Sequence, residues 1–273
     1  MRGEKALLGN GFFGIWGKDL FVKLDAREVA TVIPNAAFLE VCVNGEVPSN
    51  GDDQPLELDL SHGVVTAEIS ANDRFPANLT LETFVTLQSK NLGETFVTIR
   101  PVKGGTVKFV HGVKFKRRGP GERKARVLPE TPPLLVGQAT REDARITAVT
   151  SLVLEDLNPG VSFKRRRWTT FDGAFEEVEL GVVPGLAYRA RKIFGVTTLR
   201  ESNTPQASLA RKVLAQQRMS HELVRQTHVS LWEQAWAERP VAKDDPPLQE
   251  LLDRAWLVLL ALHDRVSPRR HQR

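Results

Sequence analysis

The sequence predicts a mainly β protein with a helical appendage, in which a large antiparallel sandwich is followed by helices. Between about residues 20 and 199, short runs rich in valine, threonine, phenylalanine and isoleucine alternate with turn residues, as is typical of strands. After Arg200 the apolar residues recur with a helical period instead. Roughly a dozen strands without an intervening helix pattern favour a sandwich of two large sheets.

The chain opens with a glycine-rich stretch and continues as regularly spaced strands. Residues 8–17 place four glycines among aromatic side chains, which suits a tight turn, and they lack the Gly-Lys-Ser/Thr ending of a phosphate-binding loop. Pairs such as Asn44-Gly45 and Asp172-Gly173 supply turns between strands. We expect strands at 38–43, 63–69, 79–87, 95–100, 106–116, 145–154, 161–167, 175–181 and 188–198.

A linker helix is expected after the last strand. Thr204-Pro205 has the cap and the first-turn proline of a helix start. Further along, His228, Trp232 and Trp236 recur at steps of four, so that one helical face carries an imidazole and two indoles. Such a face must be buried.

A further helix is expected after a break at Arg239-Pro240. It starts at Asp245-Pro246-Pro247, where an acidic cap is followed by proline in the first turn. This helix carries a wide apolar stripe that needs partner helices. The stripe consists of Leu248, Leu251, Leu252, Ala255, Trp256, Leu259 and Leu260.

Composition indicates an ordinary globular protein. The chain has 273 residues, of which 41% are hydrophobic, and its single cysteine, Cys42, excludes an internal disulfide framework. No stretch resembles a signal peptide or reaches the length of a membrane span, so we expect a cytoplasmic protein without membrane contact. The formal net charge is +5, but no nucleic-acid-binding motif accompanies the basic runs, and nucleic acid is not an expected partner. The runs at 114–118 and 123–126 flank Gly119-Pro120-Gly121 and are expected to form a solvated hairpin arm or loop.

Catalytic constellations are absent from the sequence. The six histidines lack the spacing of a zinc site, and His221 and His228, two helical turns apart, are expected to be packed or capping imidazoles. The adjacent carboxylates Glu176 and Glu177 alternate faces, whereas a glycosidase pair must converge on one bond. We therefore predict no catalytic residue, no metal site and no cofactor.

Several short segments carry a resemblance through their order. The helix with His228, Trp232 and Trp236, followed by Asp244-Asp245-Pro246, comes after segments 9–14 (GNGFFG), 33–46, 58–66 (LDLSHGVVT) and 183–198. Together they are similar to the opening, the early and last sandwich strands, and the junction between linker helix and barrel in glycoside hydrolase family 65. The resemblance extends from about residue 9 to residue 262.

The resemblance implies a galactose-mutarotase-like super-β-sandwich over residues 1–202 and a linker helix over 203–239. It also implies the first helix of a missing (α/α)6 barrel over 246–263 and a basic tail over 264–273. In this family a glutamate on a barrel loop acts as general acid on α-linked glucosides, and water or phosphate attacks with inversion. Inorganic phosphate is then a co-substrate if the parent enzyme is a phosphorylase. The glutamate corresponds to a position beyond Leu262, so no catalytic residue is transferred to this chain.

Two functions remain open at this stage. The chain is expected to be the amino-terminal, non-catalytic portion of a family 65-like enzyme, with an oligosaccharide or α-glucoside and the missing catalytic barrel as partners. The alternative is a standalone sandwich that binds carbohydrate or another protein chain, including a homo-oligomer partner. Trp16 and Trp168 are the candidate substrate-binding residues, because indole rings stack on pyranose faces and these are the tryptophans of the β region. A packing role competes for both.

Overall fold

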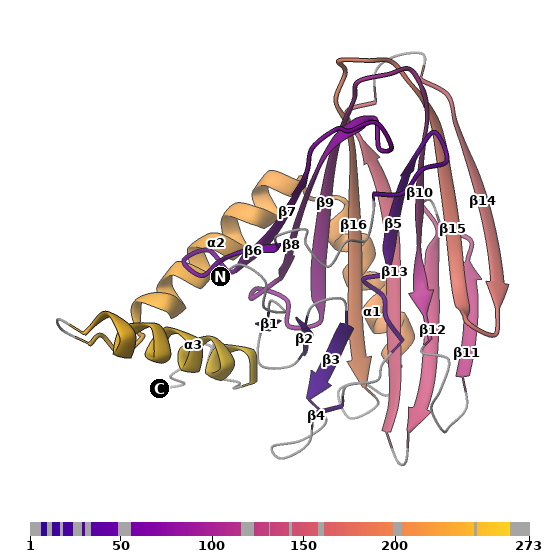
Figure 1. Ribbon diagram of the computed structural model, residues 1–273. Coiled ribbons are helices and arrows are strands. Elements are labelled where there is room, and N and C mark those ends of the chain that lie inside the picture. Colours follow the sequence, from indigo (N-terminus) through magenta and orange to yellow (C-terminus); the bar gives the residue numbers. More distant parts are fainter. Residues whose placement is uncertain are drawn as a thin grey trace.

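Strands fill the chain as far as residue 198 and helices follow, as the change of period predicts. The computed structural model describes residues 7–9, 13–16, 19–23, 29–30, 34–48, 56–115, 123–130, 132–141, 144–157, 161–198, 204–242 and 245–262. Figure 1 shows the strands β1 (Leu7–Gly9), β2 (Phe13–Trp16), β3 (Asp19–Lys23), β4 (Val29–Ala30), β5 (Leu39–Val43), β6 (Leu56–Asp59), β7 (Val64–Ile69), β8 (Ala77–Val85), β9 (Leu92–Pro101), β10 (Gly105–Lys114), β11 (Arg123–Leu128), β12 (Leu134–Arg141), β13 (Ala144–Glu155), β14 (Phe163–Thr170), β15 (Gly173–Val182) and β16 (Tyr188–Thr198). The helices are α1 (Pro205–Gln217), α2 (His221–Ala237) and α3 (Pro246–Leu262).

The described strands form an antiparallel sandwich. The larger sheet has eight strands in the order β11-β12-β13-β16-β9-β8-β7-β6, and it faces a four-stranded sheet in the order β14-β15-β10-β5. Strands β1 to β4 form a separate small sheet, beside which α3 lies. The predicted antiparallel super-β-sandwich followed by helices is therefore confirmed (Figure 1).

The core between the two sheets follows from alternation along each strand. In β15, Val178 and Leu180 point inward and are buried, and in β9 the inward residues are Val97 and Ile99. They belong to one apolar cluster that joins both sheets. Its other buried members are Val41, Val43, Phe75, Ala77, Leu79, Val107, Phe109, Leu152, Val182, Tyr188 and Ala190.

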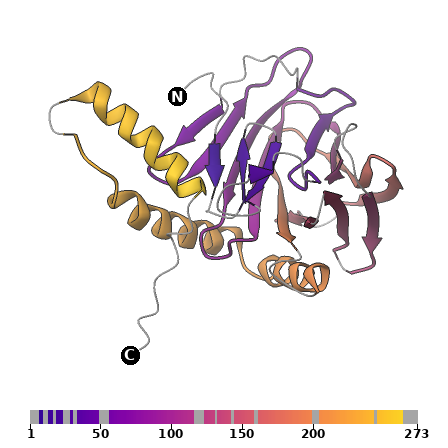
Figure 2. The same cartoon turned by 90° about the horizontal axis from the view of Figure 1, so that it is seen from below.

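Helix α1 covers the outer face of the larger sheet (Figure 2). Its Leu209 and Val213 pack with Ile193 of β16 and Val149 of β13 in a second apolar cluster. Strand β16 is thus covered on both faces, which explains why apolar residues continue through it without strict alternation.

The helix expected after Thr204 is two helices. Helix α1 ends at Gln217, and α2 begins after Ser220, whose hydroxyl accepts a hydrogen bond from the backbone N–H of Leu223 at 3.3 Å. A serine cap of this kind starts a new helix. The apolar spacing is less regular at this point because the buried Gln216 faces a carboxylate of the sheet instead of the apolar core.

Helix α2 docks on the turn that joins β6 to β7. The three residues predicted to share a buried face, His228, Trp232 and Trp236, are all buried. The indole N–H of Trp232 donates to the carbonyl of Leu60 at 2.8 Å, and its ring lies against Gly63. A Cβ at residue 63 would lie 2.2 Å from the Trp232 ring, so only glycine fits there.

Seven strands and one basic run differ from the expectations. Strands β1 to β4, β6, β11 and β12 lie outside the expected ranges. Strand β12 escapes the pattern because Leu134, Leu135 and Val136 are buried on both faces of the sheet and do not alternate with polar residues. The basic run at 123–126 lies in β11, which pairs with β12, so it does not form a hairpin with β10. None of the described helices is long and apolar enough to span a membrane.

Replacing Gly63 by alanine should lower the free energy of unfolding by about 3 kcal/mol or more. The new methyl group would displace the Trp232 ring, and residue 63 has a φ of +65° that side chains other than glycine disfavour. Gly45→Ala is the matched control, because Gly45 also has a positive φ, +85°, but has open space around it. It should cost only about 1 kcal/mol. Equal losses in urea denaturation would contradict the role of the Trp232 contact.

Candidate functional site

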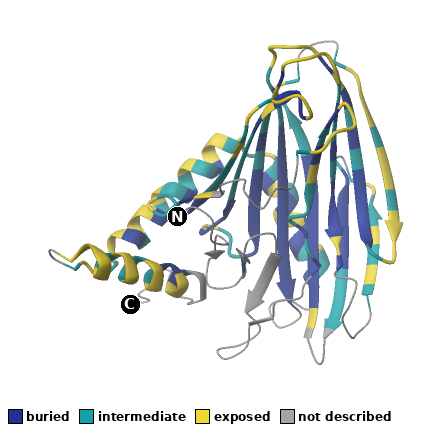
Figure 3. Ribbon diagram, viewed as in Figure 1, coloured by how far each residue is buried: buried dark blue, intermediate teal, exposed yellow. Residues whose placement is uncertain are grey.

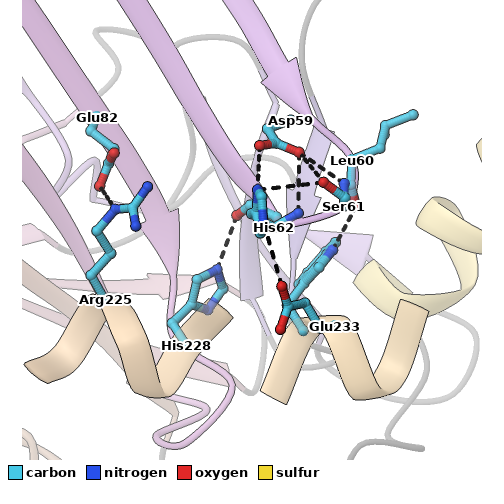
Figure 4. A network of polar contacts seen from close by, with 10 residues as sticks. Asp59, Leu60, Ser61, His62, Glu82, Arg225, His228 and Glu233 are labelled. Atoms are coloured by element: carbon cyan, nitrogen blue, oxygen red, sulfur yellow. Dashed lines mark hydrogen bonds and ion pairs between the residues drawn. The ribbon is translucent and has the colours of Figure 1, made fainter. Parts of the chain in front are cut away.

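The turn beneath α2 carries a network of polar side chains. Asp59 ends β6 and accepts hydrogen bonds from the backbone N–H of Ser61 at 3.0 Å and from the Ser61 hydroxyl at 2.6 Å. Its second oxygen lies 2.5 Å from Nδ1 of His62. On the other side of the imidazole, Nε2 lies 3.4 Å from Glu233 of α2 (Figure 4). The network therefore links the sandwich to the helix.

Aspartate, histidine and serine are the residue types of a hydrolytic triad, but their geometry here is different. In a triad the serine hydroxyl faces the imidazole nitrogen that does not bind the aspartate. Here Ser61 lies 3.4 Å from Nδ1 of His62, the nitrogen that already contacts Asp59, while Nε2 faces Glu233. This arrangement holds the turn against α2 and does not activate a nucleophile.

His228 is a packed imidazole, as the sequence predicts. Its ring stacks on Phe84 with a centroid distance of 4.7 Å, and Nε2 lies 3.1 Å from the carbonyl of Gly63 (Figure 4). Burial lowers the pKa of His228 to about 4, so the ring is neutral near pH 7 and donates a hydrogen bond to that carbonyl.

His221 belongs to a second network, where the break between the first two helices meets the larger sheet. Its Nδ1 lies 2.5 Å from the buried carboxylate of Glu94 on β9, and its Nε2 lies 3.7 Å from Glu82 on β8. Burial acts to lower the pKa of His221, but the hydrogen bonds to Glu82 and Glu94 outweigh it and raise the pKa to about 9. The charged imidazole also stacks on Phe96 at 3.9 Å, and Gln216 donates to Glu94 at 2.9 Å.

A third network lies inside the sandwich. The carboxylate of Glu176 on β15 is buried and accepts from His111 at 3.0 Å, from Arg165 at 2.8 Å and from Arg167 at 2.9 Å. Burial acts to raise the pKa of Glu176, but these donors outweigh it and lower the pKa. Burial lowers the pKa of His111 to about 4, so the imidazole donates as a neutral group.

The hairpin register explains this third network and much of the basic run in β14. Residues 171 and 172 form the turn, so Arg167 lies opposite Glu176 and Arg166 opposite Glu177. Arginine and glutamate thus meet across the two strands, and the positive charges of β14 are opposed within the sheet itself. The sequence alone indicates Glu176 only as one of two carboxylates that alternate between the faces of a strand. The Asp172-Gly173 turn is the sequence signal that places Glu176 opposite an arginine.

The structure describes the side chain of only one of the two candidate tryptophans. Trp16 is the last residue of β2, and its side chain lies outside the described part of the chain. Trp168 lies half-buried on the outer face of the smaller sheet and stacks on Phe175 at 5.7 Å with an angle of 23° between the rings. The structure thus places Trp168 where one side of the hairpin meets solvent.

Helix α3 has two apolar sides, of which one is covered. Leu257 and Leu260 are buried in the core, and Trp256 donates to the carbonyl of Ala235 on α2 at 3.1 Å. On its other sides, Leu251 is 65% exposed and Leu259 is 44% exposed. Figure 3 shows exposed residues along most of this helix. We call the exposed apolar residues of this helix the α3 face: Leu248, Leu251, Val258 and Leu259.

Metal and thiol chemistry find no support in the described residues. Within them, no group of three or more histidine, cysteine, aspartate or glutamate side chains could hold a metal ion. Burial and the neighbouring Glu40 raise the pKa of the Cys42 thiol, which disfavours the reactive thiolate.

Comparison with known proteins identifies the family. The family described as glycosyl hydrolase family 65, N-terminal domain, matches residues 6–235. This chain belongs to it. Curated protein sequences gave no match.

Solved structures share the fold. A candidate kojibiose phosphorylase from the human microbiome superimposes with a TM-score of 0.63 at 9% identity, over 95% of this chain and 39% of that one. This family 65 chain therefore spans less than half the length of that protein. Two proteins with a weaker structural similarity are a family GH92 alpha-mannosidase from Bacteroides thetaiotaomicron and a galactose mutarotase related enzyme from Lactobacillus acidophilus. Their TM-scores are 0.45 and 0.32, each at 9% identity, and they cover 79% and 72% of this chain and 29% and 97% of those chains.

His221 should make the stability of the family 65 chain fall as the pH rises. Its folded pKa, about 9, lies above the ordinary 6.5, so its contribution is complete below pH 6.5 and is lost as the pH passes about 9. The loss should be about 3 kcal/mol, measured by urea denaturation across this range. His221→Gln should remove this fall in stability. His228→Gln should lower stability yet keep the dependence, because His228 is already neutral above pH 6.5. An unchanged slope in His221→Gln would contradict the assignment.

Glu176→Gln should lower the free energy of unfolding by about 3 kcal/mol. The amide leaves Arg165 and Arg167 without their counter-charge inside the sandwich. Glu177→Gln on the opposite face of the same strand is the control. Its carboxylate lies 3.6 Å from Lys108 and is half-exposed, so the change should stay within about 1 kcal/mol. Thermal unfolding of both variants measures the two losses of stability. A smaller loss for Glu176→Gln than for Glu177→Gln would contradict the prediction.

Proposed function

We propose that this chain is the non-catalytic sandwich and linker of a family 65 enzyme that hydrolyses or phosphorolyses an α-glucoside. Membership of the family and the superposition on the candidate kojibiose phosphorylase support this proposal. The observation that carries it is the α3 face. A helix that is apolar on more than one side needs an apolar neighbour on each of them. Among the described residues, the sandwich, the small sheet and α2 cover one side of α3 and leave the α3 face exposed.

The proposed partner of the α3 face is the (α/α)6 barrel. The sandwich would extend over residues 1–202, the linker over 203–239, and the first barrel helix over 246–263. In this arrangement the remaining barrel helices would cover the exposed leucines and supply the general acid. Inorganic phosphate would be the co-substrate if the reaction is phosphorolysis, and the enzyme would act in the cytoplasm.

The networks around Glu94 and Glu176 are consistent with a supporting role. Each carboxylate is buried and engaged by donors of its own chain, Glu94 by His221 and Gln216, and Glu176 by His111 and two arginines. A general acid needs a carboxyl that can reach the leaving oxygen of the substrate. These two carboxylates instead hold strands and helices together.

The α3 face should mediate association with a family 65 barrel supplied in trans. Gel filtration of the chain with the barrel of the candidate kojibiose phosphorylase should give a complex. Leu251→Ser and Leu259→Ser should each weaken it at least about tenfold, because a buried leucine contributes about 1.5 kcal/mol or more. Leu223→Ser is the control, because Leu223 is also exposed but lies at the start of α2.

Activity gives the second readout. The complex should act on trehalose, maltose or kojibiose with or without phosphate, and the loss in the Leu251→Ser variant should follow the loss of association. The proposal would be overturned in favour of a standalone module by two results together. The chain would not bind the barrel, and it would form homo-oligomers that the Leu251→Ser substitution dissociates. An intact mass near 30.5 kDa for the protein isolated from its source would point the same way.

A further inference from the structure

Aromatic side chains form a row across the outer face of the smaller sheet. Trp168 of β14 stacks on Phe175 of β15, and Phe175 meets Phe38 edge to face at a centroid distance of 5.9 Å. The row crosses the sheet at the end where the hairpin turn lies. Phe171 stands in this turn and is 81% exposed.

Gly112 makes room for the row. It lies opposite Phe175 on the neighbouring strand β10, and a Cβ there would come within 2.6 Å of the Phe175 ring. The ring therefore lies across bare backbone, between Trp168 on one side and Phe38 on the other. Trp168 is supported from beneath by Phe175 and remains only half-buried.

The charges beside the row are of both signs. Lys108 lies 2.8 Å from Glu179 and 3.6 Å from Glu177, and these two glutamates stand opposite Lys164 and Arg166 in the register. A face of mixed charge attracts a polyanion such as a nucleic acid less than a purely basic face does. It is compatible with an uncharged ligand.

Donors lie over two of the aromatic rings. The guanidinium carbon of Arg166 lies over the Trp168 ring, 6.0 Å from its centre, and Nζ of Lys114 lies over the Phe38 ring, 4.7 Å from its centre. A pyranose offers hydroxyl groups that accept from such donors and an apolar C–H face that packs on an aromatic ring.

We propose that Trp168, Phe171 and the donor Arg166 form a binding surface for a neutral oligosaccharide. This deepens the expectation that Trp168 contacts sugar. The α-glucoside class rests on the proposed function, whereas the preference for a neutral sugar rests on the row itself. The surface lies across the sandwich from α3 (Figure 1).

Titration calorimetry of the full 273-residue chain with maltoheptaose tests the proposal. Trp168→Ala and Phe171→Ser should each raise the dissociation constant at least about tenfold. Phe171→Ser guards against misfolding, because its side chain is on an exposed turn. Phe163→Ser is the matched control: Phe163 is 44% exposed at the other end of β14 and should leave the dissociation constant unchanged.

Three results would overturn this inference: no binding of maltoheptaose by the wild-type chain, equal weakening by Phe163→Ser, or binding of a polyanion such as poly-uridylate in its place. The barrel experiment is independent of all three. If the chain associates with the barrel and the complex is active, but maltoheptaose does not bind, the binding surface is contradicted and the proposed function stands. If maltoheptaose binds in a way that depends on Trp168, but the barrel does not associate, the binding surface stands and the proposed function is contradicted.

Discussion

The position of α2 and α3 depends on one contact, that of the Trp232 indole with the bare backbone of Gly63. Strand β7 begins at the next residue, so this contact fixes α2 directly to the larger sheet. Helix α3 is then held on α2 by the hydrogen bond from Trp256 to the carbonyl of Ala235. A glycine in a turn of the sandwich therefore determines which way the α3 face points. Because packed interiors do not deform continuously, the orientation is held firmly.

Buried charge reinforces the same arrangement. Glu94 lies under the junction of α1 and α2 and is matched by the charged imidazole of His221, while Glu176 binds the edge strand β14 through Arg165 and Arg167. A buried carboxylate is tolerated only with such partners, since desolvation of an unpaired charge is costly. These networks specify register and helix placement. That is a structural task, consistent with the non-catalytic role proposed for this chain.

The sequence predicted those features that depend on local periodicity. The strand at 188–198, the buried face at Trp232 and Trp236, and the helix start at Asp245 all follow from spacing or capping. What it could not predict depends on neighbours far along the chain. Strand β12 is apolar on both faces because strands and α1 cover it, and the helix break at Ser220 exists where Gln216 turns to Glu94. The aromatic row required knowing that Gly112 lies beside Phe175.

The two surfaces differ in the kind of binding that they can support. The α3 face is aliphatic and gains free energy mainly by burial, so it suits a permanent neighbour. The row around Trp168 offers stacking at a half-exposed edge, which suits a ligand that comes and goes. Between them lies a core in which β15 and β16 are largely buried, so closely packed side chains separate the two surfaces. Under the proposed function, a sugar held on β14 would raise the local concentration of substrate.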